Sequence, residues 1–157
     1  MHVEDLGRIL DDHTFFKGID PELRQLLTGC AANERYDAGQ YLFREGAKAE
    51  KFWLIRHGTV AVEIYAAGKT PITVETLGEG DVLGWSWLVE PHKHMFDARA
   101  LTLVRAVSMD ANCLLNKMNA NHVLGYDVMR RFMPLMAHRL QAARMQMLDL
   151  YGPGRKA

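Results

Sequence analysis

Several features that would define a class of protein are scarce or absent in this sequence. Only two of its 157 residues are cysteines, Cys30 and Cys113, which are too few for a disulfide framework and do not form a CxxC metal motif. We therefore expect both cysteines to serve as small hydrophobic core residues in a protein of the reducing cytoplasm. No run of about 18 apolar residues occurs, so we predict no membrane span.

Charge of either sign is not in excess, because Lys plus Arg number 19 and Asp plus Glu also number 19. This balance gives no overall field that would attract DNA or an anionic membrane, and the basic residues do not cluster. We therefore expect no specific DNA binding by this chain alone. The first five residues, Met-His-Val-Glu-Asp, are acidic and precede no apolar segment, so we predict no signal peptide.

The patterns that carry catalysis are also missing. The sequence has no P-loop or GxGxxG motif, and no Ser/His/Asp, Cys/His or paired-carboxylate set falls on elements expected to be neighbours. His92 and His94 form a His-x-His pair, as in metal enzymes of the cupin type, but the Glu and the second, Gly-rich motif of those enzymes do not follow. These histidines are either solvated loop residues or ligands of a phosphate or a metal. We predict a protein that is not an enzyme.

What the sequence does contain is a change from helical to strand periodicity and back. Residues 1–32 have helical spacing, and Asp20-Pro21-Glu22 supplies a helix N-cap, a proline and an early negative charge. Residues 33–109 contain short apolar runs between glycine-containing turns, which predicts strands without intervening helices. The nearly continuous apolar run at 52–55 predicts a strand covered on both sides. Residues 110–151 return to helical spacing, with Asp110 as an N-cap.

The last helix is predicted over about residues 123–150 and would be roughly 40 Å long. It outruns a small β-domain, so we predict that it pairs with a second copy to form a homodimer; the alternative is a helix packed wholly on its own β-domain. Pro134 is expected to kink it. The predicted seam has the three- and four-residue spacing of a coiled coil and consists of Met129, Phe132, Met136, Leu140, Ala143 and Met147.

Four motifs in this order resemble the effector domain of the catabolite-activator/FNR superfamily. They are Phe-Phe-Lys-Gly-Ile at 15–19, the glycine-containing segment 37–46, Trp-Leu-Ile-Arg-His-Gly-Thr-Val at 53–60, and Leu-Gly-Glu-Gly-Asp-Val-Leu-Gly at 77–84. The resemblance covers roughly residues 13–150. It implies one mainly β domain with flanking helices, folded as a double-stranded β-helix jelly roll with a long C-terminal dimerisation helix. It also implies a cyclic nucleotide, or another anionic small molecule, as ligand.

The ligand-binding residues of the family are not kept here. Trp85 stands where the family has the Glu that binds the ribose, and the slot of its phosphate-binding Arg falls at His94 and Met95. Positions that offer hydroxyl groups to the base in close relatives fall near Ala143 and Arg144. Losing two charge-assisted contacts predicts cyclic-nucleotide binding that is ~100- to 10⁴-fold weaker.

We therefore predict a small anionic or aromatic ligand beside the turn that follows Gly84. His94 would strengthen anion binding as the pH falls through about 6.5, and Arg99 would add a permanent charge if it faces inward. The alternatives are tryptophans that fill the core and an Arg99 on a solvated strand face. The predicted ligand-binding residues are Gly84, Trp85, Ser86, Trp87, His94 and Arg99.

The sequence thus predicts a cytoplasmic, homodimeric and non-catalytic sensor or regulatory domain that binds a small molecule. Three alternatives remain open at this point. The chain could be a true cAMP or cGMP receptor with an unusual pocket, or a ligand-free dimerisation module whose pocket Trp85 and Trp87 fill. The third alternative is a metal-dependent, cupin-like enzyme.

Overall fold

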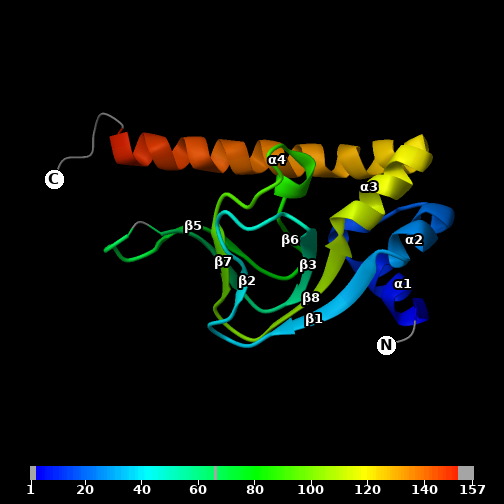
Figure 1. Ribbon diagram of the computed structural model, residues 1–157, viewed down its shortest axis with the longest axis horizontal. Helices are drawn as coiled ribbons and strands as arrows, with labels where there is room; N and C mark the ends of the chain where they lie inside the picture. The colour runs from blue at the N-terminus through cyan, green and yellow to red at the C-terminus, as the bar shows by residue number, and fades with distance from the viewer. Residues whose placement is uncertain (1–2, 66, 152–157) are drawn as a thin grey trace.

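The computed structural model describes residues 3–65 and 67–151 (Figure 1). Helices α1 (Val3–Asp12), η1 (Thr14–Phe16) and α2 (Pro21–Thr28) come first, and α3 (Ala111–Ala120) and α4 (His122–Tyr151) come last. The intervening elements are β1 (Ala31–Tyr36), β2 (Tyr41–Phe43), β3 (Lys51–His57), β4 (Val60–Ile64), β5 (Ile72–Leu77), β6 (Val82–Leu83), η2 (Ser86–Leu88), β7 (Asp97–Ala100) and β8 (Val104–Asp110). The predicted mainly β fold with flanking helices and a long C-terminal helix is confirmed.

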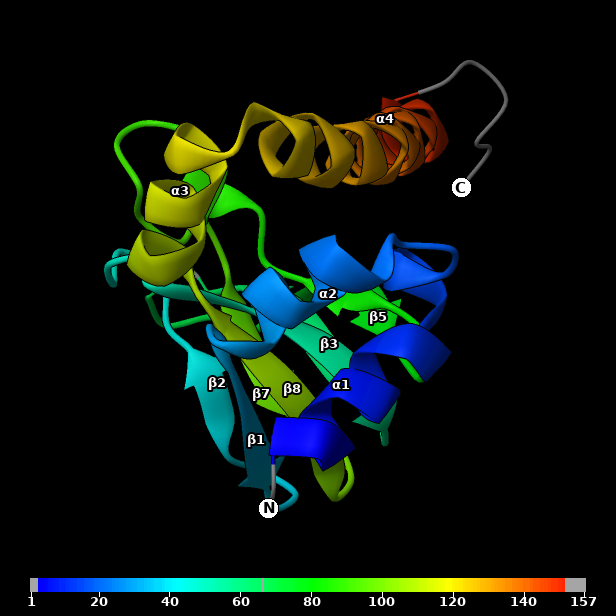
Figure 2. The ribbon, with the colours of Figure 1, turned by 90° about the vertical axis from the view of Figure 1, so that its right-hand side faces the viewer.

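The strands form two antiparallel sheets that pack as a β-roll. The first sheet has the order β1-β8-β3-β6 and the second the order β2-β7-β4-β5. Figure 2 shows α1 and α2 in front of the first sheet, and Figure 1 shows α4 running across the top of the roll. The first sheet is therefore covered by the second sheet on one face and by helices on the other.

Strand β3 is the clearest case of a strand covered on both sides. Phe52 and Leu54 pack in the core shared with the helices, whereas Trp53 and Ile55 pack in the core between the two sheets. Because successive side chains of a strand point to opposite faces, a continuous apolar run is needed where both faces are buried. The prediction made from the run at residues 52–55 is confirmed.

The first half of α4 is attached to the helical side of the core. Leu124, Val128 and Phe132 recur every fourth residue and are fully buried. The ring centroid of Phe132 lies 5.1 Å from that of Phe52 and 5.4 Å from that of Trp87. Phe132 was predicted to lie in the dimer seam, and this is wrong, because its side chain is buried in the core of its own domain.

Helix α4 runs without interruption through Pro134, and Figure 1 shows it as one straight helix. The expected kink is therefore not observed. A proline removes the hydrogen bond to the carbonyl four residues earlier, here that of Arg130. Both Pro134 and Arg130 are exposed, so water can solvate that carbonyl without a bend in the helix.

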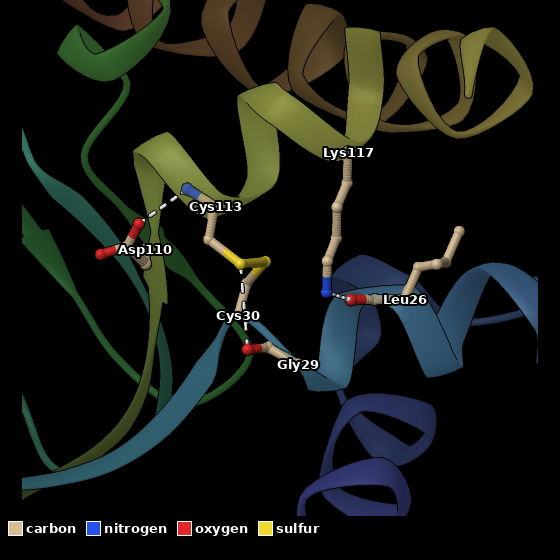
Figure 3. Close-up of a disulfide and its surroundings, with 6 residues drawn as sticks. All are labelled: Leu26, Gly29, Cys30, Asp110, Cys113 and Lys117. Carbon is tan, nitrogen blue, oxygen red and sulfur yellow. Dashed lines mark hydrogen bonds between the residues drawn. A yellow bond between two sulfur atoms is a disulfide. The ribbon is translucent and has the colours of Figure 1, made fainter. Parts of the chain in front are cut away.

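The two cysteines form a disulfide bond, which corrects the expectation that they are separate core residues (Figure 3). Cys30 and Cys113 lie 83 residues apart in sequence, and their Cα atoms are 5.6 Å apart. The backbone N–H of Asp110 donates to the carbonyl of Cys30, which brings the start of α3 beside the end of α2. Lys117 Nζ of α3 also donates to the carbonyl of Leu26 in α2 at 2.7 Å, so a hydrogen bond between the helices adds to the disulfide.

Candidate functional site

A cavity of about 1090 Å³ opens between the second sheet, the segment around η2 and the second half of α4. Its walls are largely apolar. The β-roll contributes Phe43, Val62, Ile64, Ile72, Val74, Leu83 and Phe96, and α4 contributes Met133, Met136, Ala137, Leu140, Ala142, Ala143 and Met147. A pocket of this volume can hold a molecule of the size of a typical cofactor or effector.

Four of the six predicted ligand-binding residues line this cavity: Gly84, Trp85, Ser86 and His94. Gly84 has a φ of 95°, a left-handed conformation that glycine adopts without strain, and it turns the chain from β6 toward η2. The turn leaves Trp85 half-buried in the cavity wall and Ser86 buried beside it.

Trp87 does not line the cavity, which corrects the prediction made for it. Its side chain is 1% exposed and its ring stacks on Phe52 with centroids 5.0 Å apart. The ring lies in the core beneath α4, and its Nε1 has no hydrogen-bond partner among the described residues. Of the two alternatives for the tryptophans, core filling applies to Trp87 and cavity lining to Trp85.

Arg99 also lies outside the cavity lining. It occupies β7 between Ala98 and Ala100, which are buried between the sheets, so its own side chain is on the opposite face. Its Nε and Nη2 donate to the carboxylate of Glu63 at 2.9 and 3.0 Å. The guanidinium is thus held by a bidentate ion pair and is not the inward anion clamp that was predicted.

His94 reaches the cavity, but it is not the pH-dependent clamp that was expected. Its ring stacks on Phe43 with centroids 3.7 Å apart and planes at 7°. Burial lowers the pKa of His94 to about 4, because the charged form loses its hydration. The imidazole is therefore neutral near pH 7, and anion binding that strengthens below pH 6.5 through this residue is not expected.

The cation in the cavity wall is a residue that the sequence analysis did not select. Arg139 on α4 donates from Nη2 to the carbonyl of Val82, and its Nε lies 3.5 Å from Oε2 of Glu75 on β5. Burial lowers the pKa of Arg139, and the carboxylates of Glu75 and Asp81 partly offset this effect. The side chain of Arg139 is 13% exposed.

A signal for Arg139 is present in the sequence. Starting at Leu124, the residues of α4 that face the domain recur at intervals of four, four, three and four, and the last of them is Arg139. An arginine that continues a buried apolar stripe needs a partner for its charge, and this marks the position as unusual.

Among the residues that the structure describes, no group of three or more His, Cys, Asp or Glu side chains is placed to hold a metal ion. His92 is exposed, and its Nδ1 lies 3.1 Å from the carbonyl oxygen of Trp87. His94, by contrast, is buried. Within the same described part of the chain, no helix is long and apolar enough to cross a membrane.

A two-sheet roll, a one-turn helix beside a cavity and a long final helix across its mouth define a known class of ligand-binding domain. Residues 33–121, more than half of the chain, match the cyclic nucleotide-binding domain family. The chain belongs to this family. The relationship to regulators of the catabolite-activator/FNR type, predicted from four glycine-containing motifs, is confirmed by the relatives of the chain.

Two curated relatives are 25% identical to this chain. The CRP-like cAMP-activated global transcriptional regulator of Mycobacterium tuberculosis aligns over 155 residues, which are 97% of this chain and 67% of that protein. The Anaerobic regulatory protein of Bacillus subtilis aligns over 139 residues, 88% of this chain and 57% of that protein. The chain thus spans only part of the length of each relative.

The fold also matches a solved structure closely. A cyclic nucleotide-binding domain from Methylobacillus flagellatus superposes with a TM-score of 0.78 at 18% identity. The match covers 98% of this chain and 86% of that chain. The two proteins share their architecture from the first helices to the end of the long helix.

Proposed function

We propose that this domain is a non-catalytic regulatory module whose cavity binds a small molecule other than a standard cyclic nucleotide. The observation that carries the proposal is the neutral, buried His94 in the cavity wall, at the place where the resemblance puts the phosphate-binding Arg. The same wall has Trp85 at the place of the ribose-binding Glu. A cyclic phosphate would meet an uncharged, stacked imidazole there, which cannot offset the cost of removing the phosphate from water.

The charge of the cavity supports the same proposal. Arg139 is the cation among the described lining residues, and the carboxylate of Glu75 already lies 3.5 Å from it. The other polar lining residues, Thr73 and Ser86, are neutral, as is His94 near pH 7. The pocket has no surplus of positive charge, and apolar side chains dominate its walls, which favours a ligand with a large apolar surface.

We further propose that α4 pairs with its counterpart in a second copy of this chain. The face of α4 next to the one packed on the core carries an apolar stripe with a regular spacing of three and four residues, the last five of which also line the cavity: Tyr126, Met129, Met133, Met136, Leu140, Ala143 and Met147. Met133 is 68% exposed and Leu140 73% exposed, so the single chain leaves most of this stripe uncovered. A parallel or antiparallel partner helix would bury it as a coiled-coil seam.

The cavity and the helix belong to one regulatory device in this proposal. The ligand would contact the β-roll and α4 together, so it would favour one position of α4 over another. The similarity to proteins named as transcriptional and anaerobic regulators supports a regulatory role for this movement of α4 and a cytoplasmic location. In a reducing cytoplasm the Cys30–Cys113 bond would form only when an oxidant is present.

Calorimetric titration with cAMP and cGMP tests the central claim. We expect no sub-micromolar dissociation constant for either nucleotide with the native sequence. Restoring both contacts with Trp85→Glu and His94→Arg should tighten cAMP binding by roughly 100-fold or more. Tight binding by the native sequence would overturn the proposal. A set of small apolar fragments can also be screened by NMR for chemical-shift changes at the cavity residues. If no fragment causes such changes, the result would instead favour the ligand-free dimerisation module.

A further inference from the structure

The guanidinium of Arg139 is held at the cavity wall by one hydrogen bond and one ion pair. Its Nη2 donates to the carbonyl of Val82, and this is its one hydrogen bond to the described residues. Its Nε is buried without a hydrogen-bond acceptor, although Oε2 of Glu75 lies 3.5 Å away. An arginine presents five N–H donors in a planar fork that matches a carboxylate, so this side chain can accept a further anionic partner.

The surroundings of Arg139 restrict that partner to a group with a small charge. Glu75 lies in the same cavity wall and repels any anion that approaches the guanidinium. His94, the other basic side chain of the lining, is neutral near pH 7 and stacks on Phe43. A single carboxylate can exchange with Glu75 at one arginine, whereas a group with two negative charges would have no second cation.

The remainder of the cavity suits an apolar body. The cavity wall takes Ile64 from β4, Ile72 from the edge strand β5, and Phe96 from the segment before β7. Helix α4 adds Met136 and Leu140. Trp85 adds an indole ring that can stack on an aromatic group. Methionine side chains adapt to ligands of different shape, so this wall does not demand one rigid outline.

We propose that the ligand is a monocarboxylic acid with an apolar or aromatic body, and that Arg139 binds its carboxylate. The proposal rests on the proposed function and names the chemical class of ligand for the same cavity. Because Arg139 belongs to α4 and Glu75 to β5, a carboxylate that takes the place of Glu75 would exchange a contact between helix and roll for one to the ligand. Ligand binding would thus be linked to the position of α4.

The test compares acids with their uncharged amides on the full chain at about pH 7, where carboxylic acids are ionised. The probes are 4-phenylbutyrate and decanoate, each paired with its amide, and binding is measured by calorimetry and by the change in tryptophan fluorescence, to which Trp85 in the cavity wall contributes. Each acid should bind roughly 10- to 100-fold more tightly than its amide, because only the acid forms an ion pair with the guanidinium. The Arg139→Gln variant should bind acid and amide equally.

Two further variants make the assignment specific. Arg144→Gln removes an exposed cation from the same helix outside the cavity lining, and it should keep the full preference for the acid. Glu75→Gln removes the competing carboxylate and should tighten binding of the acid but not of the amide. If Arg139→Gln fails to fold, the Glu75→Gln variant still tests whether the carboxylate of the ligand binds at Arg139.

The outcomes separate this inference from the proposed function. Equal binding of acid and amide by the native chain, or an unchanged preference in Arg139→Gln, overturns the inference. Both results leave a functional apolar cavity and so leave the proposed function standing. Sub-micromolar binding of cAMP would overturn the proposed function, whatever the carboxylate probes show.

Discussion

At the scale of single residues, the burial of His94 in a stack of aromatic rings changes its pKa. It is 4% exposed and lies against Phe43 and Trp53. Burial lowers the pKa of His94 to about 4 in the folded protein, whereas an unfolded chain gives a histidine close to 6.5. The unfolded state therefore binds a proton first as the pH falls, which shifts the equilibrium toward unfolding.

We expect this difference to make stability depend on pH in a defined window. The contribution of neutral His94 is fully present above about pH 6.5 and is lost as the pH falls from 6.5 toward 4. Between pH 7 and 5 the loss should reach about 2 kcal/mol. Urea unfolding of His94→Gln should show a smaller decrease over that interval than the native protein, and the exposed His138→Gln should match the native protein. An identical decrease in all three proteins would contradict the assignment.

The sequence located the site residues that occupy fixed places in a motif, but it did not locate Arg99 or Trp87 correctly. The neighbours Ala98 and Ala100 placed Arg99 on the face opposite to theirs, but three such residues do not reveal which face is the inner one. Trp87 lies in η2, a single turn that is too short for any periodicity to be read. The cavity-lining residues Trp85 and His94 were found through the resemblance, because both replace residues at fixed places in a motif.

At the scale of elements, the disulfide adds a covalent link to a junction that non-covalent contacts already define. Ala31 of β1 pairs with Met109 of β8, and this register brings the residue before β1 beside the first turn of α3. The sequence predicted α2, α3 and the strands between them, but it did not predict this register, and so it missed the bond between Cys30 and Cys113. A pairing across 83 residues depends on the assembled sheet rather than on any local signal.

We predict that the bond stabilises the domain by closing a long loop. In the chain-entropy description, a crosslink across 83 residues contributes up to about 4.5 kcal/mol by restricting the unfolded state. Cys113→Ser should lower the free energy of unfolding toward that extent under oxidising conditions. Dithiothreitol should weaken the native protein similarly and leave Cys113→Ser unchanged. If the reductant has no effect on the native protein, and labelling shows two free thiols beforehand, the bond does not form in solution.

At the scale of the whole molecule, α4 has two faces with different tasks. One face carries Leu124, Val128 and Phe132 into the core and ends with Arg139 in the cavity. The adjacent face carries the stripe from Tyr126 to Met147, whose members from Met133 onward also border the cavity. The sequence predicted the bounds of the helix almost to the residue, and it predicted an apolar seam. It could not show whether Phe132 or Met133 belongs to that seam, because both fit a three- and four-residue spacing. Only the packed core identifies which of the two is already buried.

We predict that the protein is a dimer in which this stripe forms the contact. Leu140 lies near the middle of the exposed part of the helix, and a carboxylate at this position would be buried without a partner in a coiled-coil seam. Leu140→Glu should therefore shift sedimentation equilibrium from dimer to monomer at tens of micromolar protein. Gln141→Glu adds the same charge one residue further on, outside the stripe, and should leave the dimer intact. Since Leu140 is exposed in the single chain, the monomeric variant should stay folded by circular dichroism, and a native protein that sediments as a monomer would contradict the prediction.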